Sequence, residues 1–179
     1  MDRASARSLR MLRNGLAKAV QRGVWFIRYV ERSKRRTMTL TALEVAKYFL
    51  ALQDDEEAIS NLKLQKLLYY AQGFHLALKG RTLFDDDIRA WEHGPVVPTV
   101  WREYNRYSGR PIPRPVGFDP NAMDDDARSL LEEVSSVYGQ FSAWRLREMT
   151  HAEPPWKNTP SQAVISQAVM EAYFKTLTT

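Results

Sequence analysis

The stretch LKLQKLLYYAQGFH, residues 62–75, decides the fold of this chain. Leucine, lysine, glutamine and alanine all favour helix, and at 100° per residue the apolar side chains gather in two stripes about 140° apart. The first stripe consists of Leu64, Leu67, Leu68, Ala71, His75 and Leu78, and the second of Leu62, Tyr69 and Leu76. A helix that is apolar on two sides is packed on by several neighbours, so we expect it to be the central buried helix of the domain.

Two glutamines lie between these stripes. Gln65 and Gln72 are therefore expected to be at least partly buried, where an unpaired amide costs about 1–3 kcal/mol. Each glutamine should accordingly have a hydrogen-bond partner. Only Lys63, Lys66 and Gly73 are left to face solvent or a closely approaching backbone.

The composition limits the classes of function. A chain of 179 residues allows one domain with a real core, and a hydrophobic share of 44% with five tryptophans indicates a folded globule. Without cysteine the chain has no disulfide, no thiol nucleophile and no thiolate metal site, which suits a cytoplasmic protein. No apolar run approaches the roughly 20 residues that span a bilayer, so no membrane span is expected.

Charge divides the chain into two parts. Residues 1–37 contain eleven basic and two acidic residues, a net charge of +9, so the remainder carries −4 of the total of +5. We therefore divide the chain into a basic N-terminal extension, residues 1–37, and a helical domain, residues 38–179. Apolar residues at spacings of three and four indicate that the extension is an amphipathic helix or a loosely ordered arm.

Three interpretations of this extension are open. It is an arm for nucleic acid or a membrane surface, a helix docked on the acidic body, or an upstream segment absent from the working protein. In the last case Met38, just ahead of a clean helix start, is the true or an alternative start. The basic residues that would contact nucleic acid are Arg7, Arg10, Arg13, Arg32, Lys34, Arg35 and Arg36.

The rest of the sequence predicts a mostly α-helical, compact multi-helix domain with one minor extended element. Thr41 and Glu44 have the spacing of a capping box at the start of a helix. Asn61 is expected to cap the central helix, and Lys79-Gly80 is expected to end it.

Turn and breaker residues divide the remaining chain. A short extended piece is expected after residues 85–87, with Gly94-Pro95 as a turn. The other expected segments are a helix from Pro98 to about Tyr107, irregular structure over 108–120, helices over 124–138 and 142–150, a turn at 154–156, and a last helix from the Ser166 cap to about Leu177 with Val169, Ala172 and Tyr173 inward.

The chain has no recognisable catalytic or metal-binding motif. Its three histidines, His75, His93 and His151, lack the spacing of zinc-binding motifs, and no serine stands in a nucleophile elbow. We expect no enzyme activity, no metal and no cofactor. His75 is expected to be a satisfied buried imidazole, and His151 is expected to tie a loop to a helix end. The polar residues assigned a structural role are His75, His151, Glu153 and Trp156.

Aromatic residues gather around the predicted extended element. Tryptophan and tyrosine are frequent at the energetic centres of protein interfaces, and an exposed short strand accepts a partner strand. The cluster is therefore either core or a groove for a protein partner. The candidate partner-binding residues are Gln65, Tyr69, Gln72, Trp91, Gly94, Pro95, Val96, Trp101 and Tyr104.

Three blocks of residues resemble one known domain family. The blocks are LQKLLYYAQG at 64–73; Leu83-Phe84, Ala90-Trp91, Gly94-Pro95-Val96-Val97-Pro98 and Tyr104; and Thr150-His151, Glu153 and Pro155-Trp156. In this order and spacing they resemble the Panacea domain of SocA-like antitoxins and phage-associated GepA-like proteins. The resemblance covers residues 38–177 and leaves the basic extension outside it.

The resemblance implies a mostly α-helical antitoxin, from a bacterium or a phage, that is encoded beside a toxin. It implies that the antitoxin neutralises this cognate toxin protein by direct binding, with delivery of the toxin to the ClpXP protease as a second mode. The alternative function, from the charge pattern, is a DNA-binding autoregulator that contacts operator DNA through the N-terminal arm.

Overall fold

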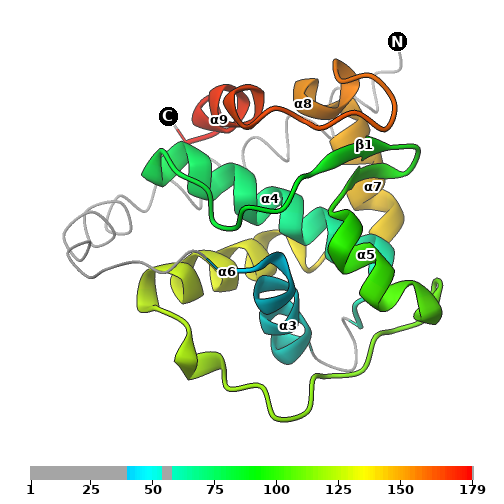
Figure 1. Ribbon diagram of the computed structural model, residues 1–179, viewed down its shortest axis with the longest axis vertical. Coiled ribbons are helices and arrows are strands. Elements are labelled where there is room, and N and C mark those ends of the chain that lie inside the picture. The colour runs from blue at the N-terminus through cyan, green and yellow to red at the C-terminus, as the bar shows by residue number, and fades with distance from the viewer. Residues whose placement is uncertain (1–39, 54–57, 179) are drawn as a thin grey trace.

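The computed structural model describes residues 40–53 and 58–178, and Figure 1 shows their arrangement. The described residues form mostly helix, as predicted, with one small hairpin. The helices are α3 (Ala42–Leu52), α4 (Asn61–Lys79), α5 (Pro98–Tyr104), α6 (Asp125–Tyr138), α7 (Ala143–Ala152), α8 (Pro154–Lys157) and α9 (Gln167–Lys175), and the strands are β1 (Arg89–Trp91) and β2 (Gly94–Val96). The predictions for residues 1–37 and for Met38 lie outside the described residues.

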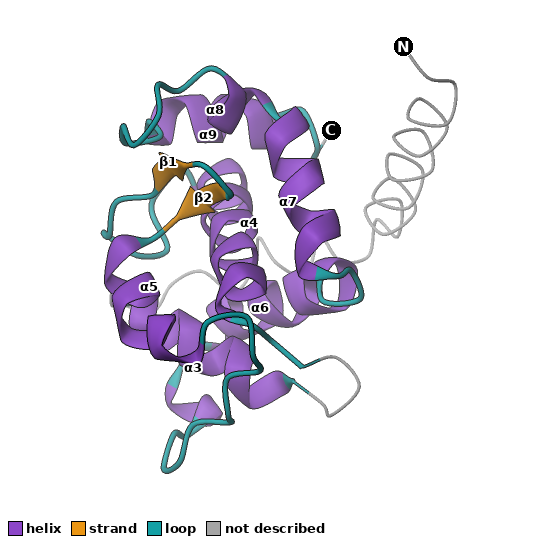
Figure 2. Cartoon of the chain, turned by 90° about the vertical axis from the view of Figure 1, so that its right-hand side faces the viewer, coloured by secondary structure: helices purple, strands orange, loops and turns teal. Residues whose placement is uncertain are grey.

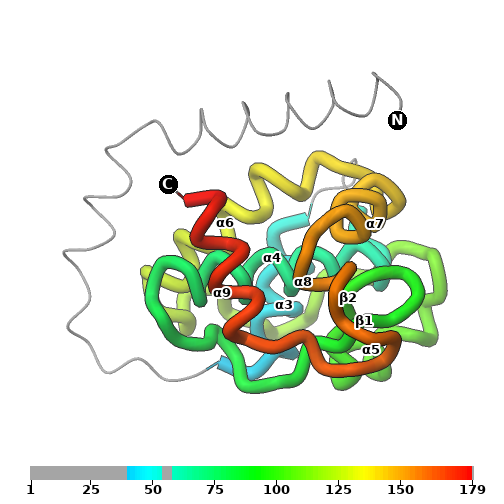
Figure 3. Tube along the Cα trace, turned by 90° about the horizontal axis from the view of Figure 1, so that it is seen from above, coloured from blue at the N-terminus to red at the C-terminus, as the bar shows by residue number. Residues whose placement is uncertain are grey.

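Helix α4 is the centre of the fold, which confirms the prediction from residues 62–75. Fifteen of its 19 residues are buried, so it has hardly any solvent face. Helices α3, α5, α6, α7 and α9 and strand β2 all pack on it. Figure 2 shows α4 between the hairpin and α7, and Figure 3 shows α9 running over it.

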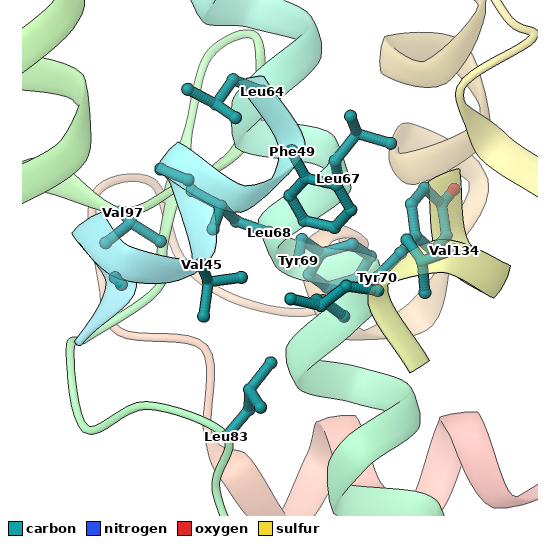
Figure 4. Close-up of a cluster of buried hydrophobic side chains, with 14 of the residues drawn as sticks. Val45, Phe49, Leu64, Leu67, Leu68, Tyr69, Tyr70, Leu83, Val97 and Val134 are labelled. Carbon is teal, nitrogen blue, oxygen red and sulfur yellow. The ribbon is translucent and has the colours of Figure 1, made fainter. Parts of the chain in front are cut away.

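The hydrophobic core surrounds α4. Leucines of α4 meet Val45 and Phe49 of α3, Val134 of α6 and the chain on either side of the hairpin, as Figure 4 shows. The aromatic ring of Tyr70 stacks on Tyr138 with centroids 3.7 Å apart. Because the core draws on segments from the whole described chain, the helices form one packed unit.

The helix ends follow from local sequence with one correction. Thr41 and Glu44 form the predicted capping box, in which the Thr41 N–H donates to the Glu44 carboxylate at 2.7 Å. Gly80 ends α4 in the left-handed conformation at φ 65°, as expected for a glycine at this position. The cap of α4, however, is Ser60 and not Asn61, because the Ser60 hydroxyl accepts from the Lys63 N–H while the Asn61 side chain bonds elsewhere.

The four later helices that the sequence predicts are all present with different ends, and a fifth, α8, is added. Asp124 and Ser142 cap α6 and α7 as side-chain acceptors. Helix α5 ends at Tyr104, and residues 105–107 continue as a 3-10 turn. The predicted turn at 154–156 is instead the short helix α8, since two prolines fit the first turn of a helix.

The extended element is a hairpin rather than a single strand with a turn at Gly94-Pro95. Gly94 and Pro95 begin β2, with Trp91 opposite Gly94 and Ala90 opposite Pro95. Proline is tolerated there because Ala90 uses its N–H and C=O on its other side, toward Ala163 and Gln162. The turn therefore lies at residues 92–93, two positions before the predicted one and between the two strands.

Helix α9 presents a different face to the core than the sequence predicts. Met170 and Phe174 are buried, whereas Val169 and Ala172 are exposed and Tyr173 is half-buried. The helix ends at Lys175, short of the predicted end at Leu177. Ser166 occupies the cap position but makes no side-chain capping hydrogen bond. Nine residues are too few for periodicity to fix the buried face when two apolar stripes compete.

Across residues 40–53 and 58–178, no helix combines the length and the apolar character needed to cross a bilayer.

Candidate partner-binding surface

Gln72 bonds the chain ahead of the hairpin to α4. Its amide nitrogen donates to the Phe84 carbonyl at 2.9 Å, and its oxygen accepts from the N–H groups of Leu83 at 2.8 Å and Phe84 at 3.3 Å. The side chain is 2% exposed. The Gln72 amide therefore bonds the backbone of residues 83–84 as a neighbouring strand would. Both its oxygen and its nitrogen have partners inside the fold.

Gln65 does the same for the chain after the hairpin. Its oxygen accepts from the Val97 N–H at 2.8 Å, and its nitrogen donates to Asn61 at 2.9 Å. Asn61 in turn donates to the Trp101 carbonyl at 3.2 Å. The two glutamines therefore have the expected partners. They bond the chain before and after the hairpin to α4, so they fix the position of the candidate surface.

Two lysines predicted to face solvent are buried instead. Lys66 is fully buried and donates to the Pro95 carbonyl at 2.9 Å, and Lys63 is only 6% exposed. Burial, and secondarily the charge of Arg147, lowers the pKa of Lys66 to about 7. Lys66 is buried because the hairpin folds over its side of α4. Lys63 instead lies beside Gly109, Pro111 and Phe141. Helical periodicity contains no information on either contact, so the expectation of exposure to solvent was wrong.

Glycine is required at position 94 by this contact. A Cβ there would lie 2.8 Å from Lys66 Cε and Nζ and 2.9 Å from Thr150 Oγ1, and φ is 102°. Both the crowding and the left-handed backbone exclude larger residues. At Gly73 the sequence allows for solvent or a closely approaching backbone, and the structure places the ring of Phe174 there instead.

A buried carboxyl lies among tyrosines at the C-terminal end of α7. Glu153 accepts from the Tyr70 hydroxyl at 2.9 Å, and Tyr69 faces the same carboxyl. Desolvation outweighs the help of these hydroxyls and raises the pKa of Glu153 to about 7. Tyr69 is fully buried, so its side chain is core and presents nothing to a partner.

His75 is the satisfied buried imidazole that the sequence predicts. Its Nδ1 lies 2.8 Å from the Arg81 carbonyl, and burial lowers the pKa of His75 to about 4. The ring is therefore neutral at physiological pH and its Nδ1–H donates to the carbonyl. Among the described residues no group of histidine and acidic side chains has the arrangement of a metal site.

His151 and Glu153 do not pair with each other. The His151 ring stacks on Trp156 at 3.7 Å between centroids and 12° between planes, while Glu153 turns to Tyr70. Trp156 Nε1 donates to the Trp91 carbonyl at 2.9 Å. His151 at the end of α7 also meets the backbone of Glu92 in the turn, so it ties a loop to a helix end as expected, and Trp156 adds a second link at the same corner.

Two side chains of the predicted partner-binding set, both tryptophans, are accessible at the surface. Gly94, Pro95, Val96 and Tyr104 are buried and form the support beneath the surface. Trp101 is 36% exposed, Trp91 is half-buried, and their rings meet edge to face at 5.2 Å. This tryptophan pair on β1 and α5 is the part of the predicted set that a partner can touch.

One exposed tryptophan was not among the predicted residues. Trp144 is 61% exposed on α7, whose buried residues are Leu146 and Thr150. Helical spacing from Leu146 and Thr150 places Trp144 on the outer face, so the sequence contained the signal. The hairpin is therefore flanked by exposed tryptophan on both sides.

Comparison with known proteins identifies the family. The family model of the antitoxin SocA-like, Panacea domain matches residues 64–157, from α4 through α8. Antitoxin SocA of Caulobacter vibrioides (strain NA1000 / CB15N) is 36% identical over 109 residues, which cover 55% of this chain and 58% of that relative. The chain thus spans less than two thirds of that relative's length. No solved structure matches. Because the family model covers more than half of the chain, including α4, the hairpin and the α7–α8 corner, this protein belongs to the antitoxin SocA-like, Panacea domain family.

Proposed function

We propose that this protein is the antitoxin of a toxin–antitoxin system and neutralises its cognate toxin by direct protein–protein binding. The observation that carries the proposal is the family match over residues 64–157, together with a relative whose name is Antitoxin SocA. The antitoxin does no chemistry of its own in this proposal. It acts as a shaped surface that covers or holds the toxin.

The surface around the hairpin suits such a role. Trp91 and Trp101 offer a partly exposed aromatic pair, and tryptophan is enriched among residues that dominate binding energy. Beneath them Gln65, Gln72 and Lys66 fix the hairpin through buried hydrogen bonds. A surface that is held in place before binding loses little conformational entropy on association.

The test is co-expression with the product of the adjacent gene. We expect that product to arrest growth when expressed alone, growth to be restored by this protein, and the two to co-purify. An adjacent product that is harmless alone, or whose toxicity this protein leaves unchanged, would contradict the antitoxin function.

Direct blocking is the proposed mode, and delivery to the ClpXP protease is the competing one. A blocking antitoxin neutralises its partner at equal stoichiometry in cells that lack ClpX. An adaptor loses neutralisation in those cells while it still binds the toxin. Comparing growth rescue and toxin half-life in the two strains decides between the modes.

A second candidate function is autoregulation through DNA. The charge of +9 on residues 1–37, against −4 on the remainder, favours it. Binding to operator DNA by this segment would fall steeply with salt and disappear on deletion of residues 1–37. Operator affinity that is unchanged by the deletion would remove the N-terminal arm as its cause.

A further inference from the structure

A basic and aromatic surface lies where α7 meets the turn of the hairpin. The guanidinium carbon of Arg147 lies 5.5 Å from the centroid of the Trp144 ring, and the imidazole of His93 meets the same tryptophan edge to face at 6.0 Å. Behind them His151 stacks on Trp156. We define the basic-aromatic surface as these five residues, which come from the turn, α7 and α8.

The foundation of this surface is rigid. Trp156 donates to the Trp91 carbonyl of β1, and Lys66 donates to the Pro95 carbonyl of β2, both at 2.9 Å. Both strands beside the turn that carries His93 are therefore fixed to the helices. The relative positions of His93, Trp144 and Arg147 are set before any partner arrives.

Two buried nitrogens of this surface have no hydrogen-bond partner among the described residues. Arg147 Nε and His151 Nε2 are buried and have no hydrogen-bond partner among residues 40–53 and 58–178. Buried polar atoms are nearly always paired, so the unpaired Nε–H of Arg147 indicates that an acceptor is missing. The neutral His151 ring meets the Glu92 backbone through its other nitrogen, so its Nε2 has no proton to donate. The missing group must be one that accepts hydrogen bonds.

Basic groups dominate the local electrostatics. Burial lowers the pKa of His151, and the charges of Arg147, Lys66 and His93 lower it further. Burial and the charge of Arg147 likewise lower the pKa of Lys66. The charged groups that act on these two side chains are all basic, so the position is favourable for an anion.

The nearby acids are used elsewhere. Glu148 of α7 pairs with Arg145 at 3.1 Å, and Glu153 is buried against Tyr70. Glu92, next to His93 in the turn, is exposed and contributes its backbone to His151. Because Glu148 and Glu153 are bonded elsewhere, neither occupies the guanidinium of Arg147, which can therefore bond to a partner.

We infer that the basic-aromatic surface receives the carboxylate of an acidic side chain on the protein partner, with Arg147 as its principal donor. A single guanidinium beside an imidazole that is mostly neutral balances one negative charge, whereas a phosphate carries about two at neutral pH. The exposed ring of Trp144 offers apolar contact to the residues that flank the acid. This inference rests on the proposed function, because the partner is the toxin.

The test measures affinity of the full chain for the purified product of the adjacent gene. Arg147→Gln should weaken binding about 30-fold, the effect typical of truncating one partner of a buried interface charge pair, and Trp144→Ala should also weaken it. Arg147→Lys should fall between, because an ammonium lacks the planar fork of a guanidinium. Arg145→Gln is the matched control: it removes a basic residue on the same helix whose charge Glu148 already balances.

Charge reversal identifies the partner's acid. Arg147→Glu should abolish binding, and substitution of one acidic residue of the toxin by lysine should restore it. Unchanged folding of each variant is checked by circular dichroism and thermal melting. The inference would be overturned if the parent, Arg147→Gln and Trp144→Ala chains bound the toxin with equal affinity. The proposed function would still stand in that case, provided that the parent chain neutralises the toxin.

A free anion as the true ligand gives a different result. Trp144 fluorescence is titrated with inorganic phosphate and with acetate in the parent chain and in Arg147→Gln. Saturable, Arg147-dependent binding of phosphate at micromolar concentration would overturn the carboxylate assignment. Weak or no response to both anions, with toxin binding still dependent on Arg147, supports it.

Discussion

Gln72 shows how one buried amide replaces a stretch of secondary structure. Three backbone groups of residues 83–84 depend on it, and none has a second partner on α4. Such a side chain has more influence on stability than its size suggests, because its loss leaves several buried groups unpaired at once.

We predict that Gln72→Leu destabilises the fold by about 3 kcal/mol, since the buried Leu83 and Phe84 groups lose their partner. Urea denaturation measures the free energy of unfolding. Gln167→Leu, at an exposed position of α9, is the control and should change it by less than about 0.5 kcal/mol. Equal stabilities of the two variants would contradict the role assigned to Gln72.

Glu153 makes stability depend on pH. Its pKa rises from 4.5 to about 7 on folding because burial disfavours the ionised form, so the folded state retains a proton that the unfolded chain releases. The carboxyl is protonated in both states below pH 4.5. Its contribution to stability therefore falls as pH rises from about 4.5 to about 7, in total by about 3 kcal/mol, and is constant above that.

His75 acts in the opposite direction over part of this range. Burial lowers its pKa from 6.5 to about 4, so its contribution rises between those values. The two contributions therefore nearly cancel between these pH values, and the stability of the parent chain shows little net change.

We predict that Glu153→Gln becomes progressively more stable relative to the parent as pH rises from 4.5 to 7, measured by denaturation at each pH. Glu148→Gln, exposed on α7, should show no such trend, and a flat difference for Glu153→Gln would contradict its raised pKa.

At the scale of elements, the contact between α4 and α9 depends on the absence of a side chain. A Cβ at position 73 would overlap the ring of Phe174. Phe174 is fully buried and also meets the rings of Tyr69 and Phe74. The ring therefore has little room to move, and the close approach fixes how α9 lies on α4.

We predict that Gly73→Ala destabilises the protein by about 1–3 kcal/mol, although alanine is the better helix former, because overpacking at Phe174 outweighs the gain in propensity. Thermal and urea unfolding provide the measurement. Combining it with Phe174→Leu should cost less than the sum of the single changes. Gly109→Ala, where a Cβ meets nothing within 4 Å, is the control. Additive costs in the double variant would contradict a direct contact.

At the scale of the whole molecule, the sequence separates a basic segment from a mildly acidic remainder that contains the described core. The described core is formed within residues 40–178, and the excess of basic residues lies in residues 1–37. We therefore propose that the domain from residue 38 onward has a hydrophobic core of its own.

We predict that residues 38–179 fold without the basic extension, with a helical circular dichroism spectrum and a melting temperature within a few degrees of the full chain's. The net charge changes from +5 to −4, so the shortened chain should no longer bind a cation exchanger at neutral pH. A large fall in melting temperature would show that the extension packs on the domain.

The sequence predicts most where local physics decides. The burial of α4 follows from its two apolar stripes, the start of α3 from Thr41 and Glu44, and the pairing of both glutamines from the cost of an unpaired buried amide. Errors occur at Lys66 and at Val169 on α9. At both positions, whether the side chain faces the core depends on which distant segment packs against that side of the helix.

By itself the sequence determined a mostly α-helical domain built around residues 61–79, with a short extended element close to tryptophans and a charge boundary near residue 37. Tertiary structure alone decided that the hairpin covers Lys66 and that Arg147 and His93 converge on Trp144. The physical reason is range. Capping and periodicity act over a few residues, whereas the Lys66–Pro95 and His93–Trp144 contacts join residues 29 and 51 positions apart, whose meeting depends on the packing of every helix between them.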